Sequence, residues 1–450
     1  MSRTIVGLTI AVMIASGCES DTLQVENDIN VILMLPLTGS FQARGELHKS
    51  AIQMAFADLT EQGDLIDGRP LRVWLVDSTS DPAEADRRLR TFIDQQLTSE
   101  DGNTRYVNAI ISSSEPAQIG SLPVALELEI PHFEISSGSR WDLFVDAADT
   151  RAHELAFMAQ AVSNQEALFV ADYINTVDVW EKLIIMRGTG TADALHTNLL
   201  RARLAQIGWS GTILNAQDII MEYDGEPWRS HLSSVDSQPV KADVIYFKLT
   251  GDRHVRDYLG DAKLVDVFSN LVSSGTTIDE ELLDSVNPGI IDFLDLNYSF
   301  AVRSPVSESL GNDNLERFKQ DFAEFTGAED YELWAPSAYD AAMVLGLGII
   351  AAGTTDGYQI ADAIEQISRG GSPINYGDTA TAVQSARVGS DLDYQGASGS
   401  FDIRDDSIEG SSRDTARAVP GEVRINQATY NDGDAKGSFV TVPMPAPQIL

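Results

Sequence analysis

The chain is poor in the residues that build disulfide frameworks and metal centres. It has one cysteine, Cys18, and six histidines among its 450 residues. A single cysteine cannot close a disulfide within the chain, and the histidines, at positions 48, 132, 153, 196, 231 and 254, show no paired metal-ligand spacing. The sequence therefore predicts neither a disulfide scaffold nor a catalytic metal, and it indicates no cofactor.

Nucleotide-binding and nucleophile motifs are missing as well. No Walker pattern occurs, and the fragment GTG at residues 188–190 has Asp193 where the third glycine of a dinucleotide fingerprint would stand. The run GASG at residues 396–399 lacks the spacing of a nucleophile elbow. We therefore expect a protein that is not an enzyme.

Basic residues are few. The sequence has 31 Lys and Arg against 68 Asp and Glu, which gives a net charge of −37. No run rich in Lys or Arg offsets this charge, which would repel nucleic acid and anionic lipid headgroups, so we expect no nucleic-acid partner. The acidity does not identify a ligand, because a solvated acidic surface that keeps the protein soluble explains it equally well.

The apolar run near the amino terminus is short. It extends over residues 5–15, too few to span a bilayer as a helix but suited to the core of a signal peptide. Ala15-Ser16-Gly17-Cys18 follows and resembles the bacterial lipobox, in which the cysteine is acylated and becomes the new amino terminus. The resemblance implies a signal peptide over residues 1–17 and lipidation of Cys18. The alternative is an accidental cysteine within a cleaved signal peptide.

Residues 18–28 are acidic and lack apolar periodicity, so we expect a solvated tether there. Several acyl chains on one residue attach a protein stably to a membrane, whereas one chain gives only marginal binding. The expected location is the periplasmic or cell-surface face of a membrane, reached through the lipid anchor only. The sequence leaves open whether this is the inner or the outer membrane.

The first folded segment has the pattern of a strand, a helix and a second strand. An apolar run over Asn30–Leu37 precedes an apolar stripe over Ala51–Leu59, and the run RVWLV then ends on Asp77. Asp81 and Pro82 are typical of the start of a second helix. This order predicts a βαβ unit of a parallel sheet, in which ligands bind outside the carboxyl ends of the strands. With 450 residues and 43% hydrophobic content, the chain can fill two domain cores.

Several segments, taken in order, resemble one protein family. The runs LPLTGSFQARG, IDGRPLRVWLVDSTSDPAEA, NAIISSSEPA and IPHFEISSGS resemble the amino-terminal lobe of type I periplasmic binding proteins. The resemblance is to the branched-chain amino acid receptor family of ABC transporters, which is leucine-binding protein-like, and it resumes at WAPSAYDAAMVLGLGIIAAG and YQGASGSFDIRDD. It implies an α/β fold of two Rossmann-like lobes with parallel central sheets, joined by a hinge that the chain crosses three times.

The resemblance also implies where the lobes lie in the sequence. We expect lobe 1 over residues 29–139 and 301–387, lobe 2 over 140–300 and 388–440, and an extended proline-rich tail over 441–450. The three crossings are therefore expected near residues 139, 300 and 387.

The ligand residues that the resemblance implies lie in two serine-containing loops of lobe 1. Ser112, Ser113 and Ser114 match a loop in which a hydroxyl and backbone N–H groups hold the ligand's carboxylate, and Ser137 and Ser139 match the next loop. A carboxylate needs several N–H or O–H donors in place of its water, which suits these residues. The alternative is that the serines cap helices.

Other positions depart from the family pattern. Arg44 and Thr250 each stand where members that bind aliphatic amino acids have an aromatic residue, and Ser273 lies in the loop where an acid would meet the ligand's ammonium group. Thr189, in the loop after an expected strand of lobe 2, completes the candidate set. These departures argue against a standard amino acid pocket. Arg44 offers a bidentate contact to an anionic group, and the alternative is that it is a solvated surface residue at the end of a loop.

The resemblance implies a lipid-anchored solute-binding protein without catalytic activity. It would capture a small polar ligand, such as an amino acid-like molecule, an amide or a carboxylate, between its lobes and deliver it to an ABC permease. The alternative is a regulatory or scaffold lipoprotein with the same fold, for example a peptidoglycan synthase activator or a ligand sensor.

Overall fold

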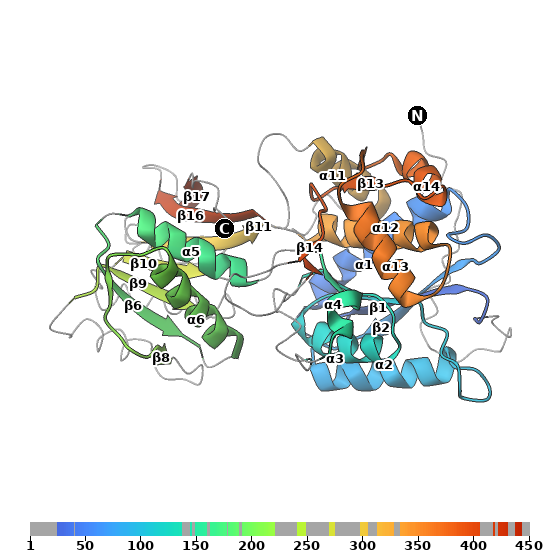
Figure 1. Ribbon diagram of the computed structural model, residues 1–450, viewed down its shortest axis with the longest axis horizontal. Helices are drawn as coiled ribbons and strands as arrows, with labels where there is room; N and C mark the ends of the chain where they lie inside the picture. Colours follow the sequence, from blue (N-terminus) through green and yellow to red (C-terminus); the bar gives the residue numbers. More distant parts are fainter. Residues whose placement is uncertain are drawn as a thin grey trace. The chain divides into compact units, whose positions relative to one another are not determined.

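The structure is a computed structural model in which the chain forms two compact units (Figure 1). The first unit contains residues 1–162 and 305–421, and the second contains residues 163–304 and 422–450. The residues that the structure describes are 25–39, 41–136, 145, 149–159, 163–177, 179–188, 191–220, 241–248, 270–274, 298–304, 313–327, 334–405, 417–418, 422–430 and 437–442.

A mostly parallel sheet forms the centre of the first unit. Its strand order is β14-β15-β5-β4-β3-β1-β2, and all neighbouring pairs except β14 with β15 are parallel. β1 is buried along its whole length, as its continuous apolar sequence predicts for a strand covered on both faces. The strands are β1 (Ile29–Leu35), β2 (Leu71–Asp77), β3 (Ala109–Ser112), β4 (His132–Glu134), β5 (Ala156–Met158), β14 (Arg404–Asp405) and β15 (Arg417–Ala418).

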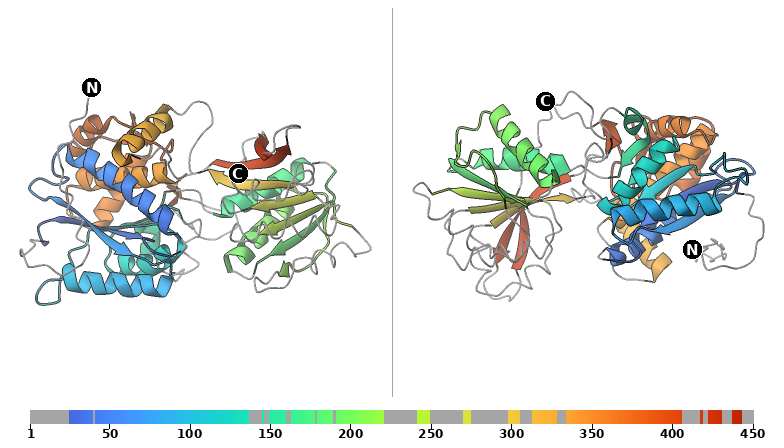
Figure 2. Two further views of the ribbon diagram at one scale, coloured as in Figure 1. Left: turned by 180° about the vertical axis from the view of Figure 1, so that it is seen from behind. Right: turned by 90° about the horizontal axis from the view of Figure 1, so that it is seen from below.

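Helices cover both faces of this sheet (Figure 2). Alternate residues of β1 enter two cores, Leu33 in one with α1 and α12, and Ile32 in the other with α2 and α3. A separate parallel pair, β12 (Ser372–Asn375) and β13 (Leu392–Gln395), belongs to the same unit. The helices are α1 (Gln42–Thr60), α2 (Pro82–Gln96), α3 (Glu115–Glu127), α4 (Arg151–Leu155), α11 (Asp313–Thr326), α12 (Ala335–Ala352), α13 (Gly357–Ser368) and α14 (Thr379–Arg387).

Helix α12 lies in the core of the first unit. Among the described helices it is the one long and apolar enough to cross a membrane by composition, but 89% of its apolar window is buried inside the protein. Gly346 permits close packing on α1, because a Cβ at this position would lie 2.3 Å from Leu59 Cδ1. The Tyr339 hydroxyl donates to Asp58 Oδ2 at 2.7 Å. These contacts join α12 to a helix almost three hundred residues earlier in the sequence.

The second unit has a sheet of its own, ordered β17-β16-β11-β10-β9-β6-β7, with β8 also paired to β6. Pairs among β6 to β11 are parallel, whereas β16 pairs antiparallel with both β11 and β17. Helices α5 and α6 pack against this sheet in a core that includes Val170, Leu200 and Tyr246. The elements are α5 (Ser163–Thr176), β6 (Lys182–Arg187), α6 (Thr191–Gln206), β7 (Thr212–Ile213), β8 (Ile219–Ile220), β9 (Val244–Lys248), β10 (Asn270–Ser274), β11 (Tyr298–Ser304), β16 (Glu422–Tyr430) and β17 (Gly437–Val442).

The predicted fold class is confirmed, since both units are α/β with parallel central strands and the chain passes between them three times. The divisions fall after residues 162, 304 and 421, so the second lies near the predicted 300, whereas the first and third lie well beyond the predicted 139 and 387. The first differs because β5 extends the sheet of the first unit beside β4. The third differs because β13 pairs with β12 of the first unit.

Parts of the predicted tether and tail are packed. Val25 lies against a core of the first unit, and Asp28 is almost fully buried and pairs with Arg72. Strand β17 includes residues 441 and 442, which the prediction assigns to the tail. Residues 18–24, which include Cys18, and residues 443–450 lie outside the described residues.

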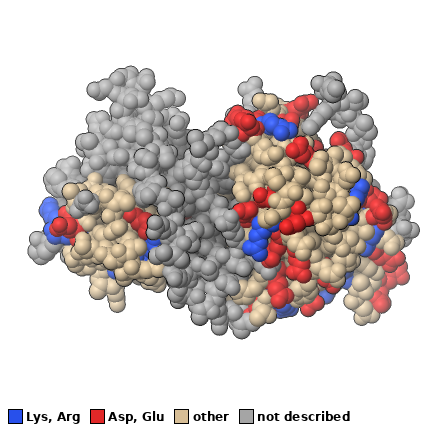
Figure 3. Space-filling model, turned by 45° about the horizontal axis from the view of Figure 1, so that its top comes forward, with Lys and Arg blue, Asp and Glu red and all other residues tan. Residues whose placement is uncertain are grey.

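The described surface of the first unit carries both signs of charge (Figure 3). On α2, Arg88 pairs with Glu84, and Arg90 pairs with Glu127 of α3. Nucleic-acid binding needs basic side chains that are available to follow a line of phosphates. The arginines of α2 are engaged with acids of the protein itself and do not form such a line.

Candidate functional site

The order of the strands in the first sheet reverses between β1 and β3. From β1 the chain passes to β2 on one side, and the later strands β3, β4 and β5 follow on the other. In open parallel sheets such a switch point leaves a crevice at the carboxyl ends of the strands, in which ligands bind. The loops after β1, β2, β3 and β4 all lie at this end, which we call the carboxyl edge of the first sheet.

A buried carboxylate, Glu134, lies at this edge. Glu134 ends β4, is fully buried and is in register with Ser112 at the end of β3. The Ser112 hydroxyl donates to Glu134 Oε2, and the backbone N–H groups of Ser114 and Ser136 donate to Glu134 Oε1 at 3.1 and 2.9 Å. Donors that the resemblance assigned to a ligand's carboxylate therefore bind a carboxylate of the chain itself.

Ser113 contacts a histidine of α1. Its Oγ lies 2.6 Å from His48 Nδ1 and 3.3 Å from Ser136 Oγ. A serine beside an imidazole is also the arrangement of an activated nucleophile. Ser113 and His48, however, have no exposed surface, so a substrate does not reach the hydroxyl in this structure. The pair instead fixes the loop after β3 against α1.

Ser114 combines a strained backbone with a side chain that makes no hydrogen bond. Its φ is +90°, which residues other than glycine rarely adopt, and its hydroxyl does not cap α3 although Ser114 precedes that helix. Only 5% of the residue is exposed, and Ser114 Oγ has no hydrogen-bond partner among the described residues. The helix-capping alternative is therefore wrong for the side chain of Ser114.

Three more side-chain oxygens at this edge are buried without a hydrogen-bond partner in the described part of the chain. They are Ser78 Oγ and Thr79 Oγ1 after β2, and Gln118 Oε1 near the start of α3. Thr79 and Ser80 also have positive φ values, 54° and 60°. Buried polar groups are normally paired, and strained backbone gathers at ligand sites. Both features make this edge the candidate functional site of the first unit.

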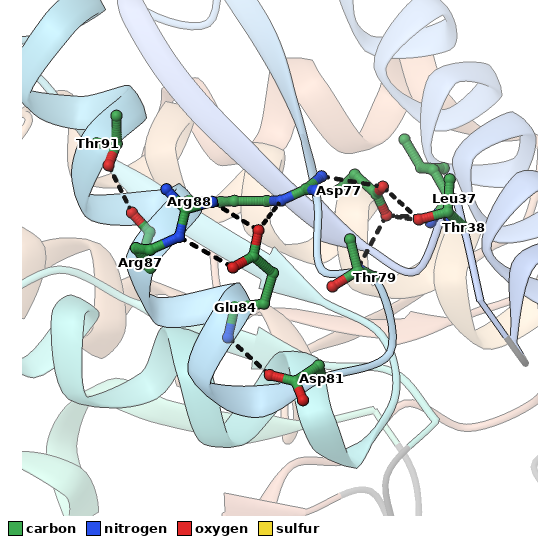
Figure 4. A network of polar contacts seen from close by, with 9 residues as sticks. All are labelled: Leu37, Thr38, Asp77, Thr79, Asp81, Glu84, Arg87, Arg88 and Thr91. Carbon is green, nitrogen blue, oxygen red and sulfur yellow. Dashed lines mark hydrogen bonds and ion pairs between the residues drawn. The ribbon is translucent and has the colours of Figure 1, made fainter.

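Asp77, the last residue of β2, holds the loop after β1 (Figure 4). Its carboxylate accepts from the backbone N–H groups of Leu37, Thr38 and Thr79, at 2.9, 3.1 and 2.9 Å, and from the Thr38 hydroxyl at 2.6 Å. Arg88 Nη1 lies 3.2 Å from Asp77 Oδ2. Partial burial acts to raise the pKa of Asp77, but the hydrogen bonds outweigh it and hold the pKa below its ordinary value. Asp77 is therefore a carboxylate at neutral pH.

Arg44 lies in the first turn of α1, next in sequence to the loop after β1. Its side chain is partly buried, and its guanidinium lies 5.8 Å from the centre of the Phe41 ring. Gly45 lets this turn approach the edge, because a Cβ there would lie 2.2 Å from the Pro36 carbonyl oxygen. The contact of Arg44 with an anionic ligand stays a prediction.

The second sheet reverses its strand order between β6 and β9. Lys248 ends β9, and its Nζ lies 3.7 Å from Glu166 Oε2 in the first turn of α5. Both side chains are almost completely buried, and a buried ion pair is costly to remove from water. Ser273, also buried, pairs in register with Phe247 on β9. The pair Lys248–Glu166 is therefore a second candidate site.

Of the predicted ligand residues, the structure brings three serines together, at positions 112 to 114. Among the described residues, no three His, Cys, Asp or Glu side chains are grouped so as to hold a metal. The predicted site residues that lie outside the described residues are Ser137, Ser139, Thr189, Thr250 and the lipidation site Cys18.

Sequence reasoning missed Glu134, Lys248 and His48. Glu134 and Lys248 each occupy the last position of a buried strand, HFE for β4 and VIYFK for β9. The sequence signal that would have identified both residues is a charged side chain at the carboxyl end of a buried parallel strand. His48 is a lone histidine within a helix, a position that carries no comparable signal.

Comparison with solved structures identifies the fold. No protein-family model matches the chain, and no curated protein matches it. A leucine-binding protein, LivK, from Thermotoga maritima is similar in structure, with a TM-score of 0.62 and 17% identity over 92% of this chain and 97% of that one. LivJ, a branched-chain amino acid transporter substrate binding protein from Streptococcus pneumoniae in complex with isoleucine, has a TM-score of 0.60 and 15% identity over 92% of this chain and 100% of that one.

A third similar structure contains an aromatic acid. It is the solute binding protein of an ABC transporter from Rhodopseudomonas palustris in complex with 3,4-dihydroxybenzoic acid, with a TM-score of 0.61 and 15% identity over 93% of this chain and 97% of that one. At identities this low the likeness establishes the fold and not the ligand. The protein has the fold of type I periplasmic binding proteins.

Proposed function

We propose that the protein is a solute-binding lipoprotein of an ABC importer that captures a small polar ligand and has no catalytic activity. One observation carries this proposal. The side-chain oxygens that are buried without a partner in the described part of the first unit all lie at the carboxyl edge of its sheet, namely those of Ser78, Thr79, Ser114 and Gln118. Such groups are expected to be paired when the protein is fully assembled with its ligand.

The similar structures support a role in uptake. Of those reported above, one is a branched-chain amino acid transporter substrate binding protein that contains isoleucine, and one is the solute binding protein of an ABC transporter that contains 3,4-dihydroxybenzoic acid. In the proposed cycle the ligand binds to the loops at the carboxyl edge of the first sheet, and the permease recognises the liganded form. Acyl chains on Cys18 keep the protein at the extracytoplasmic face of a membrane.

A regulatory or scaffold lipoprotein is the second candidate, and one observation favours it. Glu134 accepts hydrogen bonds from donors that a ligand's carboxylate would otherwise use. A carboxylate site that the protein's own side chain already occupies is compatible with a protein that recognises a partner and not a solute.

Thermal unfolding in the presence of amino acids, amides, amines, carboxylates and small peptides separates the two candidates. A ligand at a hundredfold excess over its dissociation constant should add about 3 kcal/mol to the free energy of unfolding. If no compound of this panel stabilises the protein, the scaffold role takes the place of transport.

Ser114→Ala then tests whether the ligand binds at the proposed edge. The variant should lose about 1 to 3 kcal/mol of binding free energy by calorimetry, because a buried ligand group loses a hydrogen-bond partner. Its stability without ligand should stay within about 0.5 kcal/mol of wild type, because the hydroxyl makes no hydrogen bond among the described residues. Arg369→Ala, at the end of α13, is the control, and equal affinities for both variants would place the ligand elsewhere.

A further inference from the structure

The hydrogen bonds around Glu134 are those that a carboxylate requires. An ionised carboxylate accepts hydrogen bonds and donates none. Glu134 accepts from the Ser112 hydroxyl on one oxygen and from the N–H groups of Ser114 and Ser136 on the other. The donors come from the ends of two neighbouring strands, β3 and β4, at the carboxyl edge where the strand order reverses.

Helix α3 favours an anion at the same place. Ser114 is the N-cap of this 13-residue helix, and the first N–H groups of a helix carry partial positive charge. Glu134 lies two residues after His132 on β4, so both side chains project from the same face of the sheet. His132 Nε2 lies 2.8 Å from Ser121 Oγ of α3, which shows that this face is the one that α3 covers. The amino-terminal end of α3 and the three hydrogen-bond donors therefore both favour a carboxylate at this position.

We propose that Glu134 is the permanent occupant of a carboxylate site, and that the ligand meets the first unit with a neutral or cationic polar group and not with a carboxylate. This specificity rests on the proposed function. Of the ligand classes expected from the sequence, it selects amides, and amino acid-like molecules that present their amine, over simple carboxylates.

Two features at the same edge support this specificity. Ser114 Oγ is buried and has no partner in the described part of the chain, so it offers a neutral ligand a hydrogen bond that does not involve the donors of Glu134. Asp77 places a further ionised carboxylate at this edge, paired with Arg88, and a carboxylate offers no hydrogen-bond donor to an anion.

The assignment is tested by removing the occupant and offering a small carboxylate in its place. In the full-length Glu134→Ala protein the three donors face an empty cavity, which formate or acetate fits. We expect the unfolding midpoint of this variant to be about 2 °C or more higher in sodium formate than in sodium chloride of equal ionic strength. Wild type should show no such difference. Neither should Glu127→Ala, which removes an exposed carboxylate from α3.

Equal midpoints for Glu134→Ala in formate, acetate and chloride would overturn the assignment. If this variant is recovered only as aggregate, its refolding yield in formate against chloride decides the same question. A higher yield in formate supports the carboxylate site, and equal yields remove it.

The ligand class is tested with benzoate, whose only polar group is its carboxylate. We expect benzoate not to stabilise the wild-type protein. Benzoate binding that is lost in Ser114→Ala, or in Arg44→Ala as the sequence-based prediction for Arg44 implies, would contradict the proposed specificity. If no compound stabilises the wild type, the transport role fails, whereas the formate experiment still decides the assignment of Glu134.

Discussion

Asp340, on the core helix α12, gives the protein a pH response that follows from its surroundings. It is fully buried and accepts from the Tyr394 hydroxyl at 3.0 Å and from the N–H groups of Ala397 and Ser398 at 2.8 and 2.7 Å. Burial raises the pKa of Asp340 from 3.8 to about 6, although the hydrogen bonds from Ser398, Ala397 and Tyr394 act to lower it.

A raised pKa means that the folded state favours the protonated form of Asp340. Between pH 3.8 and about 6 the folded protein binds more protons at this site than the unfolded chain does. The contribution of Asp340 to the free energy of unfolding is therefore fully present below the unfolded value and is lost as the pH rises through about 6. A difference of about two pKa units corresponds to about 3 kcal/mol.

Asp340→Asn removes this titration and keeps the shape of the side chain. We expect the difference in free energy of unfolding between wild type and Asp340→Asn, measured by urea denaturation, to change by about 3 kcal/mol between about pH 4 and about pH 7. Relative to Asp340→Asn, wild type should have a higher free energy of unfolding at about pH 4 than at about pH 7. Carboxylates with lowered pKa values, such as Asp77, respond in the opposite direction, but they are present in both proteins and cancel. A difference that does not depend on pH would refute the reasoning.

Three other substitutions test separate features. Cys18→Ala should leave the protein soluble or with its signal peptide uncleaved, as judged by fractionation and mass, and a mature membrane-bound product would exclude lipidation at this residue. Asp77→Asn should lower the free energy of unfolding at neutral pH by about 1 to 3 kcal/mol, because the carboxylate accepts four hydrogen bonds in the two loops. This loss in free energy of unfolding should shrink as the pH falls and wild-type Asp77 becomes protonated. An unchanged urea midpoint at neutral pH would show that Asp77 does not stabilise the two loops. Gly45→Ala should destabilise the first unit by about 1 to 3 kcal/mol despite the better helix propensity of alanine, because the added Cβ meets the Pro36 carbonyl. The exposed neighbour Ala43→Ser is its control in thermal unfolding, and equal midpoints would show that the turn shifts freely.

Local signals in the sequence were sufficient to predict the elements around the site. Asp81 accepts from the Glu84 N–H at 2.8 Å and begins α2, as its place before Pro82 indicates. The serines after β3 lie at the carboxyl edge because the order strand, helix, strand fixes which end of a parallel sheet each loop occupies. These features depend on a few neighbouring residues, which a sequence displays directly.

Other features depend on pairings between distant segments. Glu134 meets the Ser112 hydroxyl because β3 and β4 pair in the register that sets these residues side by side, and no local pattern fixes that register. The first division between the units was misplaced because β5 has three residues, too few for a periodicity to appear. The contacts on which the proposed specificity rests therefore became visible only in the assembled sheet.

The assembly of the first unit from two separated segments determines when the chain can fold. Strands β1 to β5 are complete by Met158, but the helix that covers one face of their sheet, α12, ends only at Ala352. The closing contact between Tyr339 and Asp58 spans 281 residues, and a loop of that size slows folding. During synthesis the early strands remain without this cover until most of the polypeptide has left the ribosome. The core of the first unit can therefore close only late in synthesis, after α12 has emerged beside α1.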